Sequence, residues 1–307
     1  MRAMTYSQYG DPSILTLTDR PLPKVAPGAV RINVMRAAVN PVDWKLMGGG
    51  LDAVLDVLFP VIPGWDVAGV VDAVGADTPE FSVGDRVASY ARKDVVSGGT
   101  FAEYVSVPAT SVARIPETVS FDEAAGLPLA GLTALRILET LEVTSDDTLL
   151  IHAASGGVGT FASQLAAARG ATVIGTASPK HHERLAGHGI TPVEYGDDLA
   201  DRVREHAPDG VTAVADLVGG QLETTLAVLA DGGRHASVAD PSVEEHGGRI
   251  IWVRPDGERL ARLLALVADG TVAVPVAGLY PLAEAASALE ANRTGAVSGK
   301  VLIDASR

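Results

Sequence analysis

Apolar and polar residues alternate with two different periods along this chain, and the change falls near residue 120. Before it, short β-branched runs recur between turn signals such as Gly10-Asp11-Pro12 and Val83-Gly84-Asp85. Such runs predict short strands, and many of them with this punctuation favour a closed or partly closed barrel. The predicted strands are residues 14–17, 30–39, 67–74, 86–89, 101–107 and 112–115.

The second pattern begins at Ser120, which precedes Glu123 with the spacing of a helix capping box. From there, apolar strands alternate with helices. Strands are expected at residues 148–153, 172–176, 192–195, 211–216, 234–238 and 249–253. Helices are expected at residues 124–138, 160–169, 180–188, 198–206, 220–229 and 256–269. This alternation predicts an α/β fold with a doubly wound parallel sheet.

The C-terminal segment, residues 272–303, mixes a strand, a helix at 282–292 and a last strand at 300–303. We expect it to return to the N-terminal part. The predicted domains are therefore residues 1–120, completed by 271–307, and residues 121–270.

The segment from Leu149 to Gly159 indicates a ligand. It predicts a strand, a glycine turn and the start of a helix, and a second apolar strand follows from residue 171. A βαβ unit with glycines at its first turn places a dinucleotide pyrophosphate on a helix N-terminus. Gly156 allows the backbone to approach the phosphates, and Gly159 allows helix and strand to pack closely. The spacing is A-x-x-G-x-x-G, with alanine where the usual fingerprint has its first glycine.

The residues after the second strand favour NADPH over NADH. An NAD site normally places an acidic residue on the ribose hydroxyl, about 20 residues after the glycines. Here Ser178 and Lys180 occupy that region, and no carboxylate precedes Glu183. A hydroxyl and an ammonium suit a phosphate, although a solvated turn would have the same composition.

Composition excludes several classes. The net charge of −14 argues against a nucleic-acid partner. The chain has no cysteine, so it has neither disulfides nor cysteine-ligated metals. No apolar run approaches about 18 residues, so no membrane span is expected. No signal-like segment occurs at the N-terminus, and a cytoplasmic location is expected.

Several motifs, in their order, resemble those of the zinc-independent quinone oxidoreductases of the medium-chain dehydrogenase/reductase superfamily. The motifs are Ala37-Ala38-Val39-Asn40-Pro41-Val42-Asp43-Trp44, Pro63-Gly64-Trp65-Asp66-Val67-Ala68-Gly69-Val70-Val71, Val83-Gly84-Asp85-Arg86-Val87, Gly99-Thr100-Phe101-Ala102-Glu103-Tyr104, Leu127-Pro128-Leu129-Ala130-Gly131-Leu132-Thr133-Ala134, Arg254-Pro255-Asp256-Gly257 and Ser298-Gly299-Lys300-Val301, together with the glycine turn.

This resemblance implies a GroES-like β-barrel substrate domain and a Rossmann cofactor domain. It also implies NADPH-dependent reduction of quinones or α,β-unsaturated carbonyls. Zinc-dependent relatives bind catalytic zinc through a cysteine and a Gly-His-Glu segment. This chain has Asn40 in the first segment and Gly64-Trp65-Asp66 in the second, and an indole does not ligate zinc. No metal site is expected.

The resemblance also implies residue roles. Asn40 and Asp43 match positions at the nicotinamide end of the active site, although turn chemistry also explains Asn-Pro-x-Asp. Trp44 and Trp65 are expected as pocket walls or as core, and Tyr90 is assigned to the substrate pocket. The expected cofactor-binding residues are Thr133, Ser155, Gly156, Gly157, Val158, Gly159, Thr176, Ser178, Lys180, Tyr195, Val218, Gly219, Ala239, Trp252, Val253 and Arg293.

Two other functions stay open. An enoyl reductase of a polyketide-type intermediate would use the same fold and hydride step on another acceptor. A non-catalytic NADPH-binding sensor or partner protein is also compatible, because no general acid is evident in the sequence. A homodimer is expected, since the predicted edge strand at residues 249–253 must be covered or paired. An edge blunted by the charges of Arg249 and Arg254 would instead leave a monomer.

Overall fold

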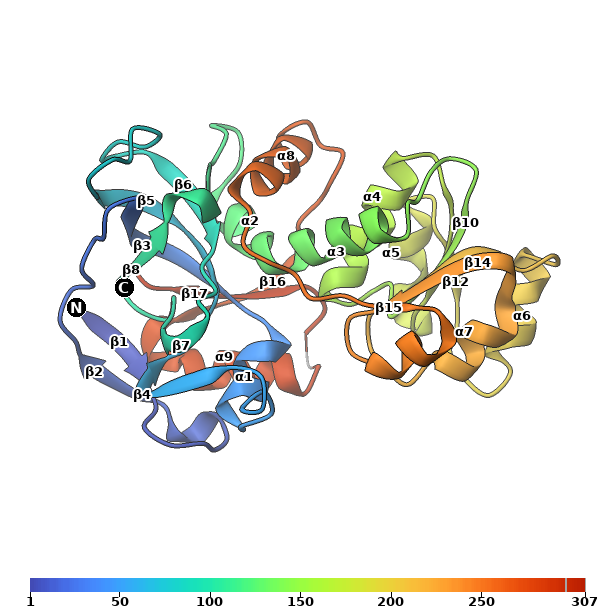
Figure 1. Ribbon diagram of the computed structural model, residues 1–307, viewed down its shortest axis with the longest axis horizontal. Coiled ribbons are helices and arrows are strands. Elements are labelled where there is room, and N and C mark those ends of the chain that lie inside the picture. The colour runs from blue at the N-terminus through green and yellow to red at the C-terminus, as the bar shows by residue number, and fades with distance from the viewer. Residues whose placement is uncertain (296, 307) are drawn as a thin grey trace. The chain divides into compact units, whose positions relative to one another are not determined.

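The computed structural model describes residues 1–295 and 297–306, which divide into two compact units (Figure 1). Unit 1 comprises Met1–Leu132 and Arg254–Arg307, and unit 2 comprises Thr133–Val253. Residues 296 and 307, in the predicted return segment, lie outside the described residues. The predicted domain boundaries remain a prediction. The division into the two units falls within one helix, α3 (Pro128–Thr140).

Unit 2 is built on a six-stranded sheet in the order β12-β11-β10-β13-β14-β15, and every neighbouring pair is parallel. In chain order this is 3-2-1-4-5-6, the order of a doubly wound dinucleotide-binding sheet. The prediction of this fold class is confirmed. The strands are β10 (Thr148–His152), β11 (Thr172–Thr176), β12 (Thr191–Val193), β13 (Val211–Asp216), β14 (Leu229–Ser237) and β15 (Arg249–Ile250).

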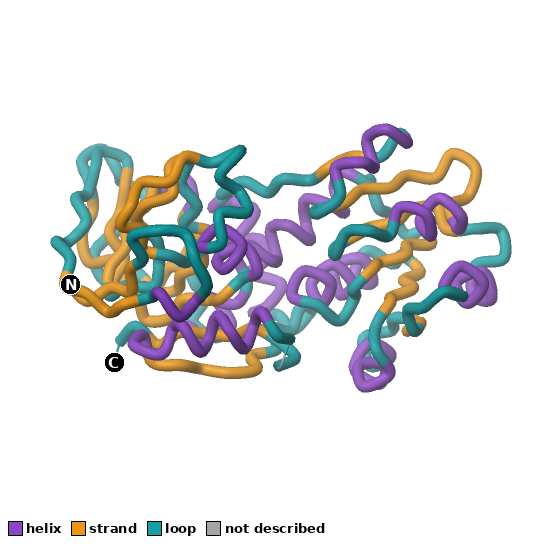
Figure 2. Tube along the Cα trace, turned by 90° about the horizontal axis from the view of Figure 1, so that it is seen from below, coloured by secondary structure: helices purple, strands orange, loops and turns teal. Residues whose placement is uncertain are grey.

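Helices follow the strands of unit 2 in alternation along the chain. Figure 2 draws the helices in purple and the strands in orange. They are α4 (Gly157–Ala168), α5 (His182–Ala186), α6 (Leu199–His206) and α7 (Leu222–Val228). Part of the core joins Leu150, Ile174 and Val214 of the sheet to Val203 of α6 and Val228 of α7. Buried apolar strands of this kind are expected where helices cover both faces of a parallel sheet.

The edge strand is shorter than predicted. Only Arg249 and Ile250 of the predicted strand 249–253 form ladder pairs, with Ala236 and Ser237. The partner strand β14 ends at Ser237, whose hydroxyl accepts hydrogen bonds from the following backbone N–H groups, so the ladder has nothing further to pair with.

Two predicted helices differ in the structure. The helix predicted at 124–138 is split into α2 (Phe121–Gly126) and α3, because Pro128 has no N–H to continue the first helix. The capping box at its start is present, with Glu123 N–H donating to the Ser120 hydroxyl at 3.2 Å. The helix predicted at 180–188 is a short 3-10 turn, η3 (Pro179–His181), followed by α5.

The helix predicted at 256–269 is present as α8 (Gly257–Ala268), but it belongs to unit 1. It packs on β9 (Val112–Arg114) and on η2 (Ala109–Ser111). A Cβ on Gly257 would lie 2.4 Å from the Val112 carbonyl oxygen, so this close approach requires glycine. The strand–helix alternation alone could not reveal which unit the helix covers.

Unit 1 contains a seven-stranded sheet in the described residues, in the order β16-β17-β3-β5-β6-β9, with β8 also paired to β3. The pairs are antiparallel except β16 with β17. Its other strands are β3 (Ala29–Val39), β5 (Asp66–Val74), β6 (Arg86–Tyr90), β8 (Tyr104–Pro108), β16 (Val276–Pro281) and β17 (Lys300–Asp304). The C-terminal β17 joins this sheet through pairs such as Val301 with Val39.

Shorter elements complete unit 1. Two small sheets pair β1 (Arg2–Thr5) with β2 (Thr16–Asp19), and β4 (Asp56–Ile62) with β7 (Val95–Gly98). Its remaining helices are α1 (Pro41–Met47), which packs on α9 (Ala285–Arg293), and the 3-10 turns η1 (Pro12–Ile14) and η5 (Leu282–Glu284). Unit 2 has one more such turn, η4 (Pro241–His246). No helix in the described part of the chain is long and apolar enough to cross a membrane.

Candidate functional site

The turn between β10 and α4 is fixed to the neighbouring strand β11. Ala153 adopts a left-handed conformation with φ of 56°, at the position where the usual fingerprint has a glycine. Its N–H donates to the Thr176 hydroxyl at 2.9 Å, and the Ala154 N–H donates to the Thr176 carbonyl at 2.9 Å. Thr176, a predicted cofactor residue, therefore holds the turn in place.

The glycines of this turn have different roles, in close packing or in leaving space beside the helix. A Cβ on Gly159 would lie 2.2 Å from the Ala153 carbonyl oxygen, so close packing of α4 requires glycine there. A Cβ on Gly156 would meet only that oxygen, at 3.2 Å, and one on Gly157 would meet nothing within 4 Å. The fold thus leaves space at the N-terminus of α4, whose first N–H groups lack intrahelical acceptors. That arrangement suits a pyrophosphate.

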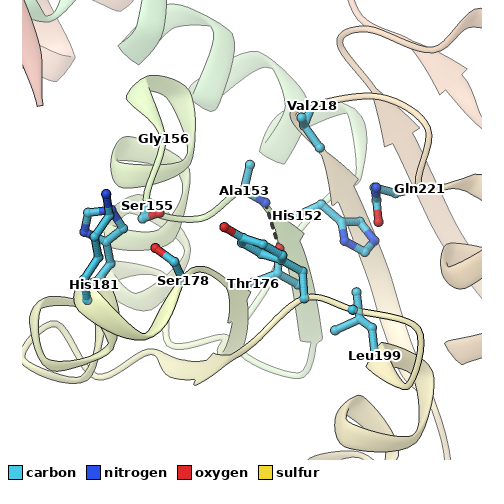
Figure 3. A pocket seen from close by; sticks show the side chains of 13 residues that line it. His152, Ala153, Ser155, Gly156, Thr176, Ser178, His181, Leu199, Val218 and Gln221 are labelled. Atoms are coloured by element: carbon cyan, nitrogen blue, oxygen red, sulfur yellow. Dashed lines mark hydrogen bonds between the residues drawn. The ribbon is translucent and has the colours of Figure 1, made fainter. Parts of the chain in front are cut away.

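A cavity of about 640 Å³ lies beside the turn (Figure 3). Of the described residues that line this cavity, none is acidic. The predicted residues that line it are Ser155, Gly156, Thr176, Ser178, Lys180, Tyr195 and Val218.

Cationic groups gather around Ser178. Lys180 and His181 line the cavity, and Arg184 donates to the Ser155 carbonyl at 3.0 Å. The pKa of the His181 imidazole is lowered by burial and then by the positive charges of Arg184 and Lys180. The Lys180 ammonium and the Arg184 guanidinium are positive charges that a nearby anion would stabilise, so this part of the cavity suits a phosphate group.

Other lining residues were not singled out from the sequence. They include His152 at the end of β10, Leu199 at the start of α6 and Gln221 before α7, which lie away from Ser178 and His181 in Figure 3. His152 is 1% exposed, and burial lowers its pKa to about 4, so its imidazole is neutral at pH 7. Its position at the carboxyl end of a parallel strand was a signal that could have identified it.

Asp216 organises the loop after β13. Its Oδ1 accepts hydrogen bonds from the N–H groups of Val218 at 3.0 Å and Gly219 at 2.9 Å. The Ser237 hydroxyl donates to its Oδ2 at 2.8 Å and accepts from the Ala239 N–H at 3.1 Å. The predicted residues Val218, Gly219 and Ala239 therefore belong to one bonded group at the strand ends.

The remaining predicted cofactor residues do not line the cavity. Thr133 is a buried residue of α3, and Trp252 and Val253 follow β15. Arg293, at the end of α9, donates two hydrogen bonds to Glu290, at 2.8 and 2.7 Å. Val158 lies in the first turn of α4. Their cofactor roles stay predictions.

In unit 1, Asn40 and Asp43 belong to a buried polar network. Asn40 Nδ2 donates to Asp66 Oδ2 at 2.8 Å, and Lys300 Nζ donates to Asn40 Oδ1 at 2.6 Å. The backbone N–H of Asn40 donates to Asp43 Oδ2 at 2.7 Å. The protein itself therefore engages both ends of the Asn40 amide. Asp66 and Lys300 were missed as functional candidates, although both lie in the motifs that carry the family resemblance.

The predicted pocket aromatics lie in different surroundings. Trp65 and Tyr90 are 6% and 2% exposed and meet edge to face, with ring centroids 6.0 Å apart. The Trp44 indole N–H donates to Asn292 Oδ1 at 3.0 Å, which ties α1 to α9. Whether these rings also line a substrate pocket stays a prediction.

The part of the chain that the structure describes contains no group of three or more histidine, cysteine or acidic side chains that could hold a metal ion. Asp43 Oδ2 and Asp66 Oδ2 both accept hydrogen bonds from Asn40 in the unit 1 network.

Two protein-family models match the chain. The model described as "Alcohol dehydrogenase GroES-like domain" matches residues 26–117. The model described as "Zinc-binding dehydrogenase" matches residues 191–303.

Similar proteins cover almost the whole chain. The chloroplastic NADPH-dependent alkenal/one oxidoreductase of Arabidopsis thaliana is 32% identical over 312 residues, covering 99% of this chain and 79% of that protein. The structure of the quinone oxidoreductase from Coxiella burnetii superposes with a TM-score of 0.89 at 32% identity, covering 99% of each chain. The mycobacterial protein Rv1454c complexed with NADPH gives a TM-score of 0.86 at 30% identity, again covering 99% of each chain.

The motif order, the doubly wound sheet with its glycine turn and these matches agree over the length of the chain. The chain belongs to the quinone oxidoreductase family of the medium-chain dehydrogenase/reductase superfamily.

Proposed function

We propose that this protein is an NADPH-dependent oxidoreductase that reduces quinones or α,β-unsaturated carbonyl compounds without zinc. One observation carries the proposal. A single cavity, with no acidic residue among the described residues that line it, extends from the glycine turn at the N-terminus of α4 to the Lys180 ammonium near Ser178. The names of the relatives support it, since they describe an NADPH-dependent alkenal/one oxidoreductase and a quinone oxidoreductase.

Unit 2 has the residues to hold NADPH. The space beside Gly156 and Gly157 accepts the pyrophosphate, and Ser178, Lys180 and His181 surround the position for the ribose phosphate. When bound, NADPH supplies the hydride. The other residues that we propose for cofactor binding are Thr133, Ser155, Val158, Gly159, Thr176, Tyr195, Val218, Gly219, Ala239, Trp252, Val253 and Arg293.

The chain's own contribution is binding, orientation and exclusion of water. We assign the catalytic roles to Asn40 and Asp43 of unit 1, and the substrate pocket to Trp44, Trp65 and Tyr90. Because Lys300 and Asp66 engage its amide, Asn40 acts by fixing the geometry of this network rather than by a free amide group. Zinc chemistry lacks ligands here, since the chain has no cysteine and Trp65 stands within the segment that ligates zinc in relatives.

We also propose that the protein is a homodimer and that it is located in the cytoplasm. Each chain would consist of the two predicted domains, residues 1–120 with 271–307 and residues 121–270. Support for the dimer comes from β15, a two-residue strand at the edge of the unit 2 sheet. In a dimer, β15 of one chain would pair with β15 of the second chain across a two-fold axis. A molar mass of one chain by light scattering would contradict it.

A panel of acceptors tests the proposed function. The purified protein is assayed with NADPH and with para-quinones, ortho-quinones, enones and a polyketide-type enoyl thioester. Turnover with quinones or enones supports the proposal. Turnover restricted to the thioester points to the enoyl reductase, and tight NADPH binding without any turnover points to a non-catalytic protein.

A further inference from the structure

His181 lies at the cationic end of the unit 2 cavity. It is the last residue of η3, and it lines the cavity together with Ser155, Ser178 and Lys180. Figure 3 shows His181 and Ser178 at the same end of the cavity as Ser155. The residues that line this cavity all belong to unit 2. His181 therefore borders the position that we propose for the ribose phosphate of NADPH.

The adjacent histidine has different surroundings. His182 begins α5, and its Nε2 lies 3.1 Å from the Ala177 carbonyl oxygen. A hydrogen bond to a backbone carbonyl fixes both the orientation of an imidazole and the nitrogen that carries its proton. The residues that line the cavity include His181 but not His182. Of the two neighbouring imidazoles, the one that borders the space for a ligand is that of His181.

Arg184 connects this end of the cavity to the glycine turn. Its guanidinium donates to the Ser155 carbonyl at 3.0 Å, which holds α5 against the turn that precedes α4. Burial lowers the pKa of Arg184, but an arginine keeps its charge at neutral pH. A fixed positive charge therefore lies near His181, whether or not a cofactor is bound.

The groups around His181 disfavour its protonation in the free protein. Burial is the largest cause that lowers its pKa, followed by the charges of Arg184 on α5, Lys180 on η3 and His182 on α5. The Tyr195 phenol lines the cavity from the segment after β12, and a phenol can donate a hydrogen bond to a phosphate. Because the ordinary imidazole pKa is 6.5 and this one is lower, His181 is mostly neutral at pH 7.

A bound phosphate would reverse this balance. A phosphate monoester carries about 1.5 to 2 negative charges at neutral pH, and a nearby anion favours the charged form of an imidazole. The imidazolium also has a donor on each ring nitrogen, whereas the neutral ring has one donor in total. Phosphate binding is then coupled to the uptake of a proton by His181. NADH has an uncharged hydroxyl at this position and lacks that coupling.

We propose that protonated His181 helps to select NADPH over NADH, and that this preference weakens as the pH rises between about 6.5 and 8. The inference rests on the proposed function, through NADPH binding in the unit 2 cavity, and adds pH as a regulator of that site. Lysine and arginine side chains keep their charge over this range, so His181 supplies the part of the attraction that varies. A proton moves from the solvent to the imidazole when NADPH binds, and it returns when the cofactor leaves.

The direction of the pH effect follows from linkage. The complex binds its proton more tightly than the free protein does, so the added affinity is complete below the pKa of free His181. It is lost as the pH rises through the higher pKa of the complex. Below a pH of about 6 the phosphate itself takes up a proton, so the effect is measured above that value.

The test compares His181→Asn with His188→Asn, which makes the same change at an exposed histidine that follows α5. Calorimetry in buffers with different ionisation enthalpies gives the number of protons taken up for each cofactor bound. At pH 7 the unaltered protein and His188→Asn should take up about 0.3 to 0.5 proton more per NADPH than His181→Asn does. With NADH, the three proteins should take up equal numbers of protons.

A pH series separates this role from a merely structural one. Between about pH 6.5 and 8, the Kd for NADPH relative to that for NADH should rise about three- to tenfold in the unaltered protein, and it should stay level in His181→Asn. Thermal unfolding verifies that the variants fold. NMR of the His181 ring in the unaltered protein tests the coupling without a variant, because bound NADPH should raise its pKa.

The outcomes distinguish this inference from the proposed function. Equal proton uptake on NADPH binding in the unaltered protein and in His181→Asn, or a His181 pKa that NADPH does not raise, would overturn the inference. NADPH that does not bind to the unaltered protein, or that binds and is not oxidised by quinones or enones, would instead overturn the proposed function.

Discussion

Lys300 Nζ and Asn40 Oδ1 form a hydrogen bond of 2.6 Å across 260 positions of sequence. The contact follows from sheet topology, since β17 lies antiparallel to β3 and pairs Val301 with Val39. The residue before Val301 and the residue after Val39 are therefore brought together at one end of the pair. The C-terminal segment thus supplies the ammonium group that lies beside the Asp66 carboxyl.

Lys300→Met should destabilise unit 1. Methionine matches the length of the stem but removes the ammonium, which leaves Asp66 without a counter-ion and the Asn40 amide oxygen without its donor. Loss of one partner of a buried ion pair costs about 3–5 kcal/mol. Chemical denaturation should show this loss, whereas Lys24→Met, at an exposed lysine, should leave stability within about 0.5 kcal/mol. Equal stabilities would show that the buried ammonium is not needed.

Asp43 should make the folded protein less stable as pH rises. Its pKa is about 8 when folded and about 3.8 when exposed, so between these values the folded state holds a proton that the unfolded state has released. Since the folded state binds more protons, stability falls over this interval. Asp43→Asn should flatten the decline between pH 6 and 8, above the folded pKa of Asp66 of about 6. Parallel curves of stability against pH for the two proteins would show that Asp43 does not hold this proton in the folded state.

The sequence predicted the bounds of individual strands and helices better than it predicted how those elements pair and pack. The apolar runs at 172–176 and 211–216 became β11 and β13 with the predicted bounds, because buried parallel strands have a clear pattern. The length of β15 depended on where its neighbour β14 ends, which is a tertiary property. The placement of α8 in unit 1 depended on the close approach of Gly257 to Val112, which no periodicity encodes.

The same limit applies to the sites. The glycine turn, Ser178 and Lys180 lie within one βαβ unit, so local pattern sufficed to predict that they lie together. His152, Leu199 and Gln221 line the same cavity from three different strand or helix ends. The unit 1 network joins residues from positions 40, 66 and 300, and its charge balance becomes visible only when they meet.

Lys180→Ala should change cofactor preference. The ammonium lines the cavity beside Ser178, where the ribose phosphate of NADPH is proposed to bind. Loss of one charge-assisted contact should weaken NADPH binding by about 1–3 kcal/mol and leave NADH binding nearly unchanged. Calorimetry with both cofactors measures this, with Lys24→Ala as the exposed control. An equal loss of affinity for both cofactors would remove the phosphate role.

The glycine turn allows binding and folding to be separated. Gly156→Val should abolish NADPH binding, because a branched side chain would occupy the space for the pyrophosphate, while its Cβ has only one protein atom nearby, at 3.2 Å. Gly159→Ala should mainly lower stability, because its Cβ would lie 2.2 Å from a backbone oxygen. Thermal unfolding and fluorescence titration with NADPH distinguish the two effects. Normal NADPH affinity in Gly156→Val would refute the proposed pyrophosphate position.

Activity should persist in a chelator. The chain has no cysteine, and Trp65 stands in the segment where zinc-dependent relatives carry a ligand, so we expect the reduction to need no zinc. The assay compares turnover before and after prolonged dialysis against a strong chelator, with metal content measured in parallel. Stoichiometric zinc whose removal stops turnover would refute this expectation.

The most direct measurement of the central claim follows a deuterium label from the cofactor to the acceptor. The protein is incubated with NADPH that carries deuterium at the transferable position and with a simple enone, and the product is analysed by mass spectrometry and NMR. The account predicts a saturated ketone with one deuterium at the β-carbon, formed in equal amount to the NADPH consumed. A product without the label, or NADPH that binds tightly but is never oxidised by either enones or quinones, would contradict it.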